Sequence, residues 1–179
     1  MSSHTAYQDL PERSTNFAHN ETGISGEYFV MHMLSRQGYI CSMSTGAAKG
    51  IDIMVYDPET NKFCKVEVKT ARDAYRSPKT EPFYDWPVSS KAEQRRESNL
   101  VYCFVHLGQS LKDTRCFLFR AEDVANLVTK EHADWAATGK DEATRKKRMD
   151  STLRKFWFDE AKNATAHEDA WHLINEALT

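Results

Sequence analysis

The sequence predicts an α/β fold in which helices flank a mixed β-sheet, with a helical C-terminal extension. Three observations lead to this prediction. Helical periodicity occurs near the N-terminus, strand-like stretches follow between residues 39 and 120, and helical patterns then continue to residue 178. A helix, several strands and then further helices are typical of α/β or α+β domains. With 179 residues, 40% of them hydrophobic, the chain is long enough for one domain with its own core.

The first element expected is a helix over residues 23–38, preceded by a polar arm over 1–20. Apolar residues recur there at helical spacing, and Gly38 is a typical C-terminal stop. The expected apolar stripe consists of Ile24, Tyr28, Val30, Met31 and Leu34.

Strands are expected over 39–44, 51–57, 62–70, 100–107 and 115–120. The sequence PETN between the second and third of them suits a four-residue turn, so these two should form a hairpin. The segment 71–98 contains prolines and is expected to be a loop with a short strand over 83–89 and a charged helical turn over 91–98. The stretch 100–107 is almost continuously apolar, which indicates a strand covered on both faces.

Helices are expected over 121–136, 141–163 and 167–178. The predicted organisation is therefore an arm over 1–20, a core over 21–120 and a helical extension over 121–179 packed on the core. Four aromatic side chains of this extension cannot share one face of a helix, so we expect core packing first and dimerisation second. They are Phe156, Trp157, Phe158 and Trp171.

Charge and composition narrow the classes of partner. Lys and Arg number 24 against 26 Asp and Glu, a formal net charge of -2, so any contact with nucleic acid must come from a local patch. The four cysteines form no CxxC pair; buried reduced thiols are expected, with zinc or disulfide roles left open. The histidines show no metal-ligand spacing and are given no catalytic role. No apolar run could span a bilayer and no nucleotide-binding motif is evident, which predicts a cytoplasmic protein without a membrane partner.

The predicted hairpin over 51–70 carries charges where strands usually bury apolar or neutral residues. Because side chains alternate across a strand, Asp52 shares one face with Glu67 and Lys69, and a turn centred on 59–60 places Asp52 opposite Glu67. Facing carboxylates repel unless a cation or a proton lies between them. Mg²⁺ would supply the cation, held by both carboxylates and a backbone carbonyl such as that of Val68.

Lys69, on the same face, would then touch the attacking water or the substrate phosphate. The alternative is an exposed sheet face on which Glu67 forms solvated ion pairs with Lys65 and Lys69, each contributing little to stability. A one-residue bulge would also break the register that sets Asp52 opposite Glu67.

Three motifs in this order, SGEYFVMHML, GID and VEVK, resemble the PD-(D/E)xK nuclease superfamily, which includes restriction-endonuclease-like and Holliday-junction-resolvase-like proteins. The resemblance covers about residues 22–120. Asp52 matches the first motif acid, Glu67 and Lys69 match the second motif, and Glu27 matches an acid that many members add to the metal site. The sequence departs from the motif in having GID where PD would stand, which leaves the carboxylate in place.

The resemblance implies a restriction-endonuclease-like fold and a Mg²⁺-dependent endonuclease that hydrolyses phosphodiester bonds of DNA, with Mn²⁺ able to substitute. It implies metal ligation by Asp52, Glu67, Glu27 and the carbonyl of Val68. One alternative is a catalytically inactive nuclease-fold module that binds DNA or mediates assembly; a structural protein without a nucleic-acid role is a third. Cleavage of RNA, exonucleolytic cutting and homodimerisation are left open.

Other residues are candidates for contact with the nucleic-acid backbone. The loop over 44–50 offers Ser44, Thr45 and Lys49, and Lys91 begins a stretch that also contains Arg95 and Arg96. The strongest basic cluster is Arg145, Lys146, Lys147 and Arg148. The alternative for the loop over 44–50 is a flexible connector. The stretch that begins at Lys91 can equally be a solvated helix start, and the basic cluster a solvated helix face.

Overall fold

The computed structural model describes residues 19–44, 50–78, 81–160 and 164–179. Its elements, in chain order, are α1 (His19–Arg36), β1 (Ile40–Met43), β2 (Ile53–Asp57), β3 (Lys62–Ala71), β4 (Tyr75–Arg76), β5 (Phe83–Ser89), the 3-10 helix η1 (Ser90–Gln94), β6 (Leu100–His106), β7 (Arg115–Arg120), α2 (Ala121–Ala137), α3 (Glu142–Met149), β8 (Leu153–Asp159), α4 (Thr165–His167) and α5 (His172–Ala177).

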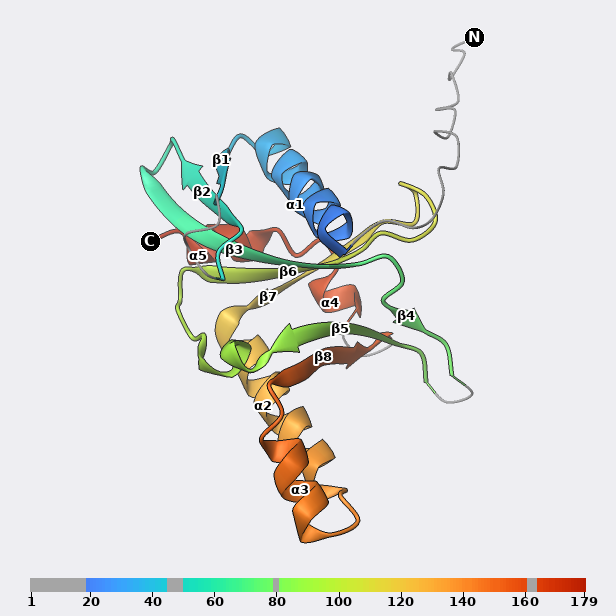
Figure 1. The fold of residues 1–179 in the computed structure, drawn as a ribbon. Coiled ribbons are helices and arrows are strands. Elements are labelled where there is room, and N and C mark those ends of the chain that lie inside the picture. Colours follow the sequence, from blue (N-terminus) through green and yellow to red (C-terminus); the bar gives the residue numbers. More distant parts are fainter. Residues whose placement is uncertain (1–18, 45–49, 79–80, 161–163) are drawn as a thin grey trace.

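The strands form two sheets (Figure 1). The larger has the order β1-β2-β3-β6-β7, in which β3 and β6 run parallel and the other neighbours are antiparallel. The smaller has the order β4-β5-β8 and is antiparallel. The prediction of an α/β fold with a mixed sheet flanked by helices is confirmed.

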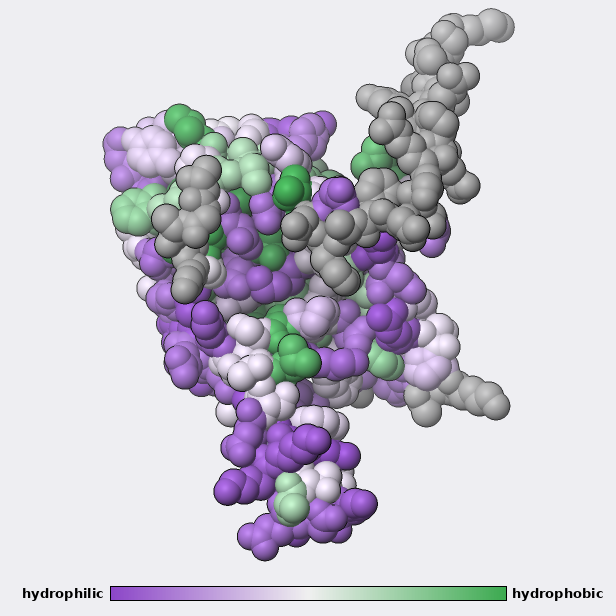
Figure 2. All heavy atoms as spheres, in the orientation of Figure 1, coloured by the Kyte–Doolittle hydropathy of each residue, from purple (hydrophilic) through white to green (hydrophobic). Residues whose placement is uncertain are grey.

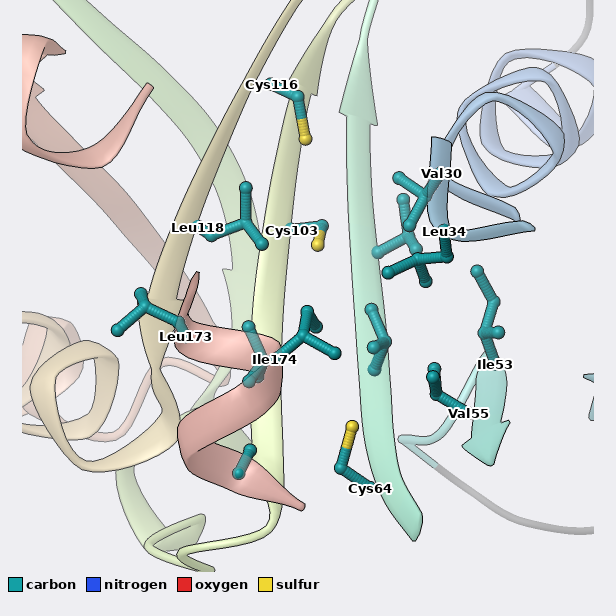
Figure 3. Close-up of a cluster of buried hydrophobic side chains, with 14 of the residues drawn as sticks. Val30, Leu34, Ile53, Val55, Cys64, Cys103, Cys116, Leu118, Leu173 and Ile174 are labelled. Carbon is teal, nitrogen blue, oxygen red and sulfur yellow. The ribbon is translucent and has the colours of Figure 1, made fainter. Parts of the chain in front are cut away.

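Strand β6 is buried on both faces, as its continuous apolar sequence predicts. Its residues Val101, Cys103 and Val105 belong to a first hydrophobic cluster, which α1 and α5 cover. In Figure 3, Val30 and Leu34 point from α1 toward the strands. The alternate residues of β6 belong to a second cluster that also contains side chains of β5, β8 and α2. The larger sheet is therefore a central layer with a core on each side.

Helix α1 packs through only part of the predicted stripe, with Val30 and Leu34 in the core and Met31 at its margin. Gly26, Val30 and Leu34 are buried, whereas Ile24 and Tyr28 are 45% and 59% exposed. The reason is Gly26: a Cβ there would overlap the hydroxyl oxygen of Thr70 on β3 and lie 2.8 Å from the Thr70 methyl carbon. The missing side chain lets the helix backbone approach β3 closely and so sets which face turns inward.

The helix predicted over 141–163 is wrong over most of its length. In the described part of this range, α3 covers Glu142–Met149, whereas residues 153–159 form β8, which pairs with β5. Along β8, Arg154, Phe156 and Phe158 are buried while Lys155 is exposed, a spacing of two residues that belongs to a strand. The four aromatic residues therefore need not share one helix face.

The proposed domain boundary at residue 120 coincides with the junction between β7 and α2. We keep the division into a core over 21–120 and an extension over 121–179 as a proposal, with the correction that the extension contributes a strand. Residues 1–18 of the predicted arm lie outside the described residues, and 19–20 begin α1.

The cysteines are all free thiols, as predicted. Cys64, Cys103 and Cys116 are buried, and burial raises the pKa of Cys64 to about 12. No helix in the described part of the chain has the length and apolar character needed to cross a membrane.

Candidate active site

The β2–β3 hairpin has the predicted register, with Ile53 opposite Val66 and Asp57 opposite Lys62. Ile53 and Val55 face the first hydrophobic cluster together with Val66 and Val68. Glu67 and Lys69 therefore lie on the other face of β3, where Glu67 is next to Tyr102 of β6. Glu67 is only 9% exposed, so the alternative of a solvated sheet face does not hold for this residue.

Asp52 lies one residue before β2 and is fixed by the free edge of β3. Its backbone N–H donates to the Val66 carbonyl at 2.9 Å, and its Oδ2 accepts the Val68 N–H at 2.7 Å. The carboxylate thus continues the hydrogen bonding to β3 where the backbone of β2 has stopped. Asp52 is turned toward the Val68 amide and is not part of a ladder pair with Glu67.

Glu67 is held by three donors. The Lys69 ammonium lies 2.7 Å from Oε1, the Arg95 guanidinium lies 3.5 Å from Oε2, and the Tyr102 hydroxyl hydrogen-bonds to the same carboxylate. Lys69 Nζ also donates to the Val68 carbonyl at 3.4 Å. A cation therefore already contacts two of the oxygen groups that were predicted to bind metal.

Glu27 approaches from α1, on the opposite side of β3 from Glu67. Burial, and then the negative charge of Asp52, raise the pKa of Glu27, while the charge of Lys69 acts in the opposite direction. The causes of this shift place Glu27 near both Asp52 and Lys69. The negative charge at this edge of β3 is thus only partly compensated by the protein.

The donor set fits Mg²⁺ in kind, because it consists of carboxylate and carbonyl oxygens at the end of a strand pair. Within the residues it describes, however, the structure does not bring three acidic side chains together around one point, as was predicted for the metal site. Throughout the described ranges, no three His, Cys, Asp or Glu side chains lie close enough together to hold a metal ion.

Comparisons with known proteins bear on the fold. No protein-family model and no curated protein matches the sequence. Among solved structures, the chain is similar to a bacterial homing endonuclease, I-Ssp6803I, with a TM-score of 0.52 and 13% sequence identity over 88% of this chain and 93% of that one.

This chain has a restriction-endonuclease-like fold. The resemblance noted from the three sequence motifs is therefore supported at the level of the fold. Within this fold the candidate acids occupy the end of the β2–β3 hairpin and the helix that precedes it, as the motif order implies.

Two of the residues predicted to contact a nucleic-acid backbone, Ser44 and Lys91, lie in the described ranges. Ser44 follows β1, and its N–H donates to the Asp52 carbonyl at 2.8 Å. Lys91 is exposed on η1. Thr45 and Lys49 lie outside the described residues.

The basic cluster lies on α3, at the end of the molecule away from α1 and β3 (Figure 1). Figure 2 shows the projecting α2–α3 hairpin covered mainly by hydrophilic residues. Arg145 donates to the Gly139 carbonyl, and Arg148 donates to the Trp135 carbonyl and stacks on its ring. These two arginines hold the hairpin together, while Lys146 and Lys147 are exposed.

Two residues that contact Glu67 in the candidate site, Arg95 and Tyr102, were not predicted from the sequence. Arg95 was considered only as a phosphate contact and Tyr102 only as part of an apolar strand. Each reaches Glu67 through tertiary structure: Tyr102 through the parallel pairing of β3 with β6, and Arg95 from the loop after η1. The sequence signal that was available is the charged stretch RRE just before β6.

Proposed function

We propose that this protein is a metal-dependent endonuclease that cleaves DNA. The observation that carries the proposal is the group of charges at the free edge of β3. There Asp52 is fixed by the Val68 amide, and Lys69 joins Glu67 to the Val68 carbonyl. The motif order and the restriction-endonuclease-like fold support the same function.

Asp52, Glu67 and the Val68 carbonyl would hold a Mg²⁺ ion, with Glu27 as an additional acid at the border of the site. When bound, the metal would lower the pKa of a water molecule and polarise a phosphoryl oxygen. Glu27 and Asp52 supply negative charge that the neighbouring cations leave partly uncompensated, and this favours cation binding.

Lys69 would act on the substrate. The Lys69 side chain is 28% exposed, so its ammonium can reach a phosphate from the solvent side while it remains 2.7 Å from Glu67. In that position it orients the attacking water and stabilises the charge that develops on the phosphoryl oxygens.

DNA is proposed as the substrate because the similar solved structure is that of a homing endonuclease. Lys91 on η1 and Lys146 and Lys147 on α3 offer exposed cations for phosphates. Cutting both strands of a duplex requires two sites, so we extend the proposal to a homodimer as the cutting species.

The test is cleavage of plasmid, linear and branched DNA with Mg²⁺ by the wild type, Glu67→Gln and Lys69→Met. We expect each substitution to slow cleavage about 100-fold or more, because each removes a charge in contact with the reacting groups. Lys62→Met is the matched control, since Lys62 is an exposed lysine of the same strand, and it should cut like the wild type. Unchanged cleavage in both site variants would overturn the proposal.

A second candidate function, a catalytically inactive nuclease-fold module that binds DNA, is favoured by one observation. Glu67 already has a cation on each of its oxygens. If the wild type binds DNA and cuts none of the three substrates with Mg²⁺ or Mn²⁺, this second function replaces the first.

A further inference from the structure

Arg95 connects three segments that contain or border the candidate site. Its Nε donates to both carboxylate oxygens of Glu97, at 2.8 and 3.1 Å, and its Nη1 donates to the Gly50 carbonyl at 2.9 Å. Gly50 precedes Asp52 by two residues and has a φ of +79°. A Cβ at Gly50 would overlap Nη1 of Arg95 and lie 3.2 Å from Oε2 of Glu67. The Arg95 guanidinium thus packs closely against the backbone at Gly50, just before Asp52.

The same Nη1 lies 3.5 Å from Glu67 Oε2, and both side chains are mostly buried, at 18% exposed for Arg95 and 11% for Glu67. Charges act on one another more strongly there than at the surface, because little water screens them. A divalent cation that binds Glu67 must therefore compete with Arg95 for Oε2.

The contact with Glu67 is the longest that Arg95 makes. The contacts with Glu97 and Gly50 are within 3.1 Å, so Arg95 can release Glu67 while it keeps its other two partners. Glu97 also draws the guanidinium away from Glu67, since one cation divides its attraction between two carboxylates.

We propose that Arg95 is a resident counter-cation of Glu67 that lowers the affinity of the site for a divalent metal, and that Glu97 regulates this competition. The inference rests on the proposed function, because it requires that Glu67 bind a metal. Arg95 is a positioning residue in this account and has no contact with reacting atoms.

The experiment is calorimetric titration of the full chain with Mn²⁺ at fixed ionic strength, for the wild type, Arg95→Gln, Glu97→Gln and the double variant. Arg95→Gln should bind Mn²⁺ more tightly, on the order of tenfold, because a competing charge is removed. Glu97→Gln should bind it more weakly, because Arg95 loses the carboxylate charge that its Nε contacts and turns to Glu67. With Gln at position 95, the Glu97→Gln change should have a much smaller effect, since its action passes through Arg95.

Arg96→Gln is the matched control. This exposed neighbour carries the same charge but donates to Asn126 at 2.6 Å and makes no contact with Glu67, so its loss should leave Mn²⁺ affinity unchanged. Thermal unfolding without metal shows whether each variant is folded. If Arg95→Gln does not fold, the Mn²⁺ affinity of Glu97→Gln still tests the proposal.

The outcomes separate the two proposals. If Asp52→Asn abolishes Mn²⁺ binding but Arg95→Gln binds Mn²⁺ as the wild type does or more weakly, the counter-cation proposal fails and the nuclease proposal stands. If the wild type binds no Mn²⁺ at all, both are overturned.

Discussion

At the level of single residues, the acids of the site differ in what compensates their charge. Glu67 has Lys69, Arg95 and Tyr102, and Asp52 has the Val68 amide. Glu27 is partly buried beside Asp52, and its pKa is raised first by burial and then by that neighbouring charge. The raised pKa means that ionisation of Glu27 opposes folding.

This difference predicts a pH-dependent effect of Glu27→Gln in metal-free buffer. Because the pKa of Glu27 is raised in the folded state, stability from its protonated form is present below the ordinary value of 4.5 and is lost as the pH rises through the folded-state pKa. The free energy of unfolding of Glu27→Gln should exceed that of the wild type at pH 7. The excess should shrink as the pH falls through the folded-state pKa of Glu27 and should vanish below 4.5, as measured by urea denaturation with EDTA.

Glu21→Gln serves as the control, since Glu21 is an exposed glutamate on the same helix. It should show no such gain at pH 7. An equal gain in both variants, or a gain for Glu27→Gln that does not change with pH, would contradict the account of Glu27.

At the level of elements, the close approach of α1 to β3 determines where Glu27 is held. The approach depends on Gly26, whose missing Cβ leaves room for Thr70. Gly23 lies one turn earlier in the same helix and has no atom within 4 Å of a Cβ built on it. The two glycines therefore offer a direct comparison between packing and helix propensity.

We expect Gly26→Ala to lower the free energy of unfolding by about 1–3 kcal/mol through overpacking against β3. Gly23→Ala should raise it by about 0.5–1 kcal/mol, because alanine favours the helix and meets nothing. Urea denaturation of both variants measures the difference, and a loss of stability in Gly23→Ala would contradict it.

Thr70→Ala tests the cause of the Gly26 effect. The Thr70 hydroxyl is buried and, in the part of the chain that the structure describes, has no hydrogen-bond partner, so its removal should cost little. Combined with Gly26→Ala, it should restore a clear part of the lost stability, since the two side chains would occupy the same space.

Strand β8 shows what the sequence pattern could have revealed. Phe156 and Phe158 alternate with Lys155 and Trp157, which indicates a strand, but the stretch lies between two helical patterns and was assigned to them. The existence of the strands of the larger sheet, by contrast, follows from patterns that are clear in the sequence. The hairpin register was predictable because its turn is short and local.

The site was predictable only as far as its residues are neighbours in the sequence. Asp52, Glu67 and Lys69 belong to one hairpin, and their placement at its open end was predicted. Arg95 and Tyr102 were missed because they reach Glu67 through the parallel pairing of β6 and the loop that precedes it. Nothing in the local pattern specifies such long-range contacts.

At the scale of the whole molecule, the net charge of -2 gives no general attraction for DNA. Attraction must come from limited surfaces, and the exposed lysines of α3 form one. The structure narrows the predicted cluster of four cations to Lys146 and Lys147, because Arg145 and Arg148 hydrogen-bond within the α2–α3 hairpin.

Replacing Lys146 and Lys147 together by alanine should weaken DNA binding to a similar extent on all sequences. The dependence of log K on log salt should become less steep by about 1 for each phosphate that the variant no longer neutralises. Fluorescence anisotropy at several salt concentrations measures both quantities. Lys112→Ala is the control, since Lys112 is an exposed lysine in the loop between β6 and β7; equal weakening in the control would remove α3 from the interface.

The parallel pairing of β3 with β6 has a consequence for synthesis on the ribosome. A nascent chain can complete α1 and the first three strands locally, but the edge of β3 that receives β6 stays open until residues 100–106 have emerged. During that interval β3 has unpaired amide and carbonyl groups along this edge, which other chains can join. This interval is when chaperones would protect the protein most.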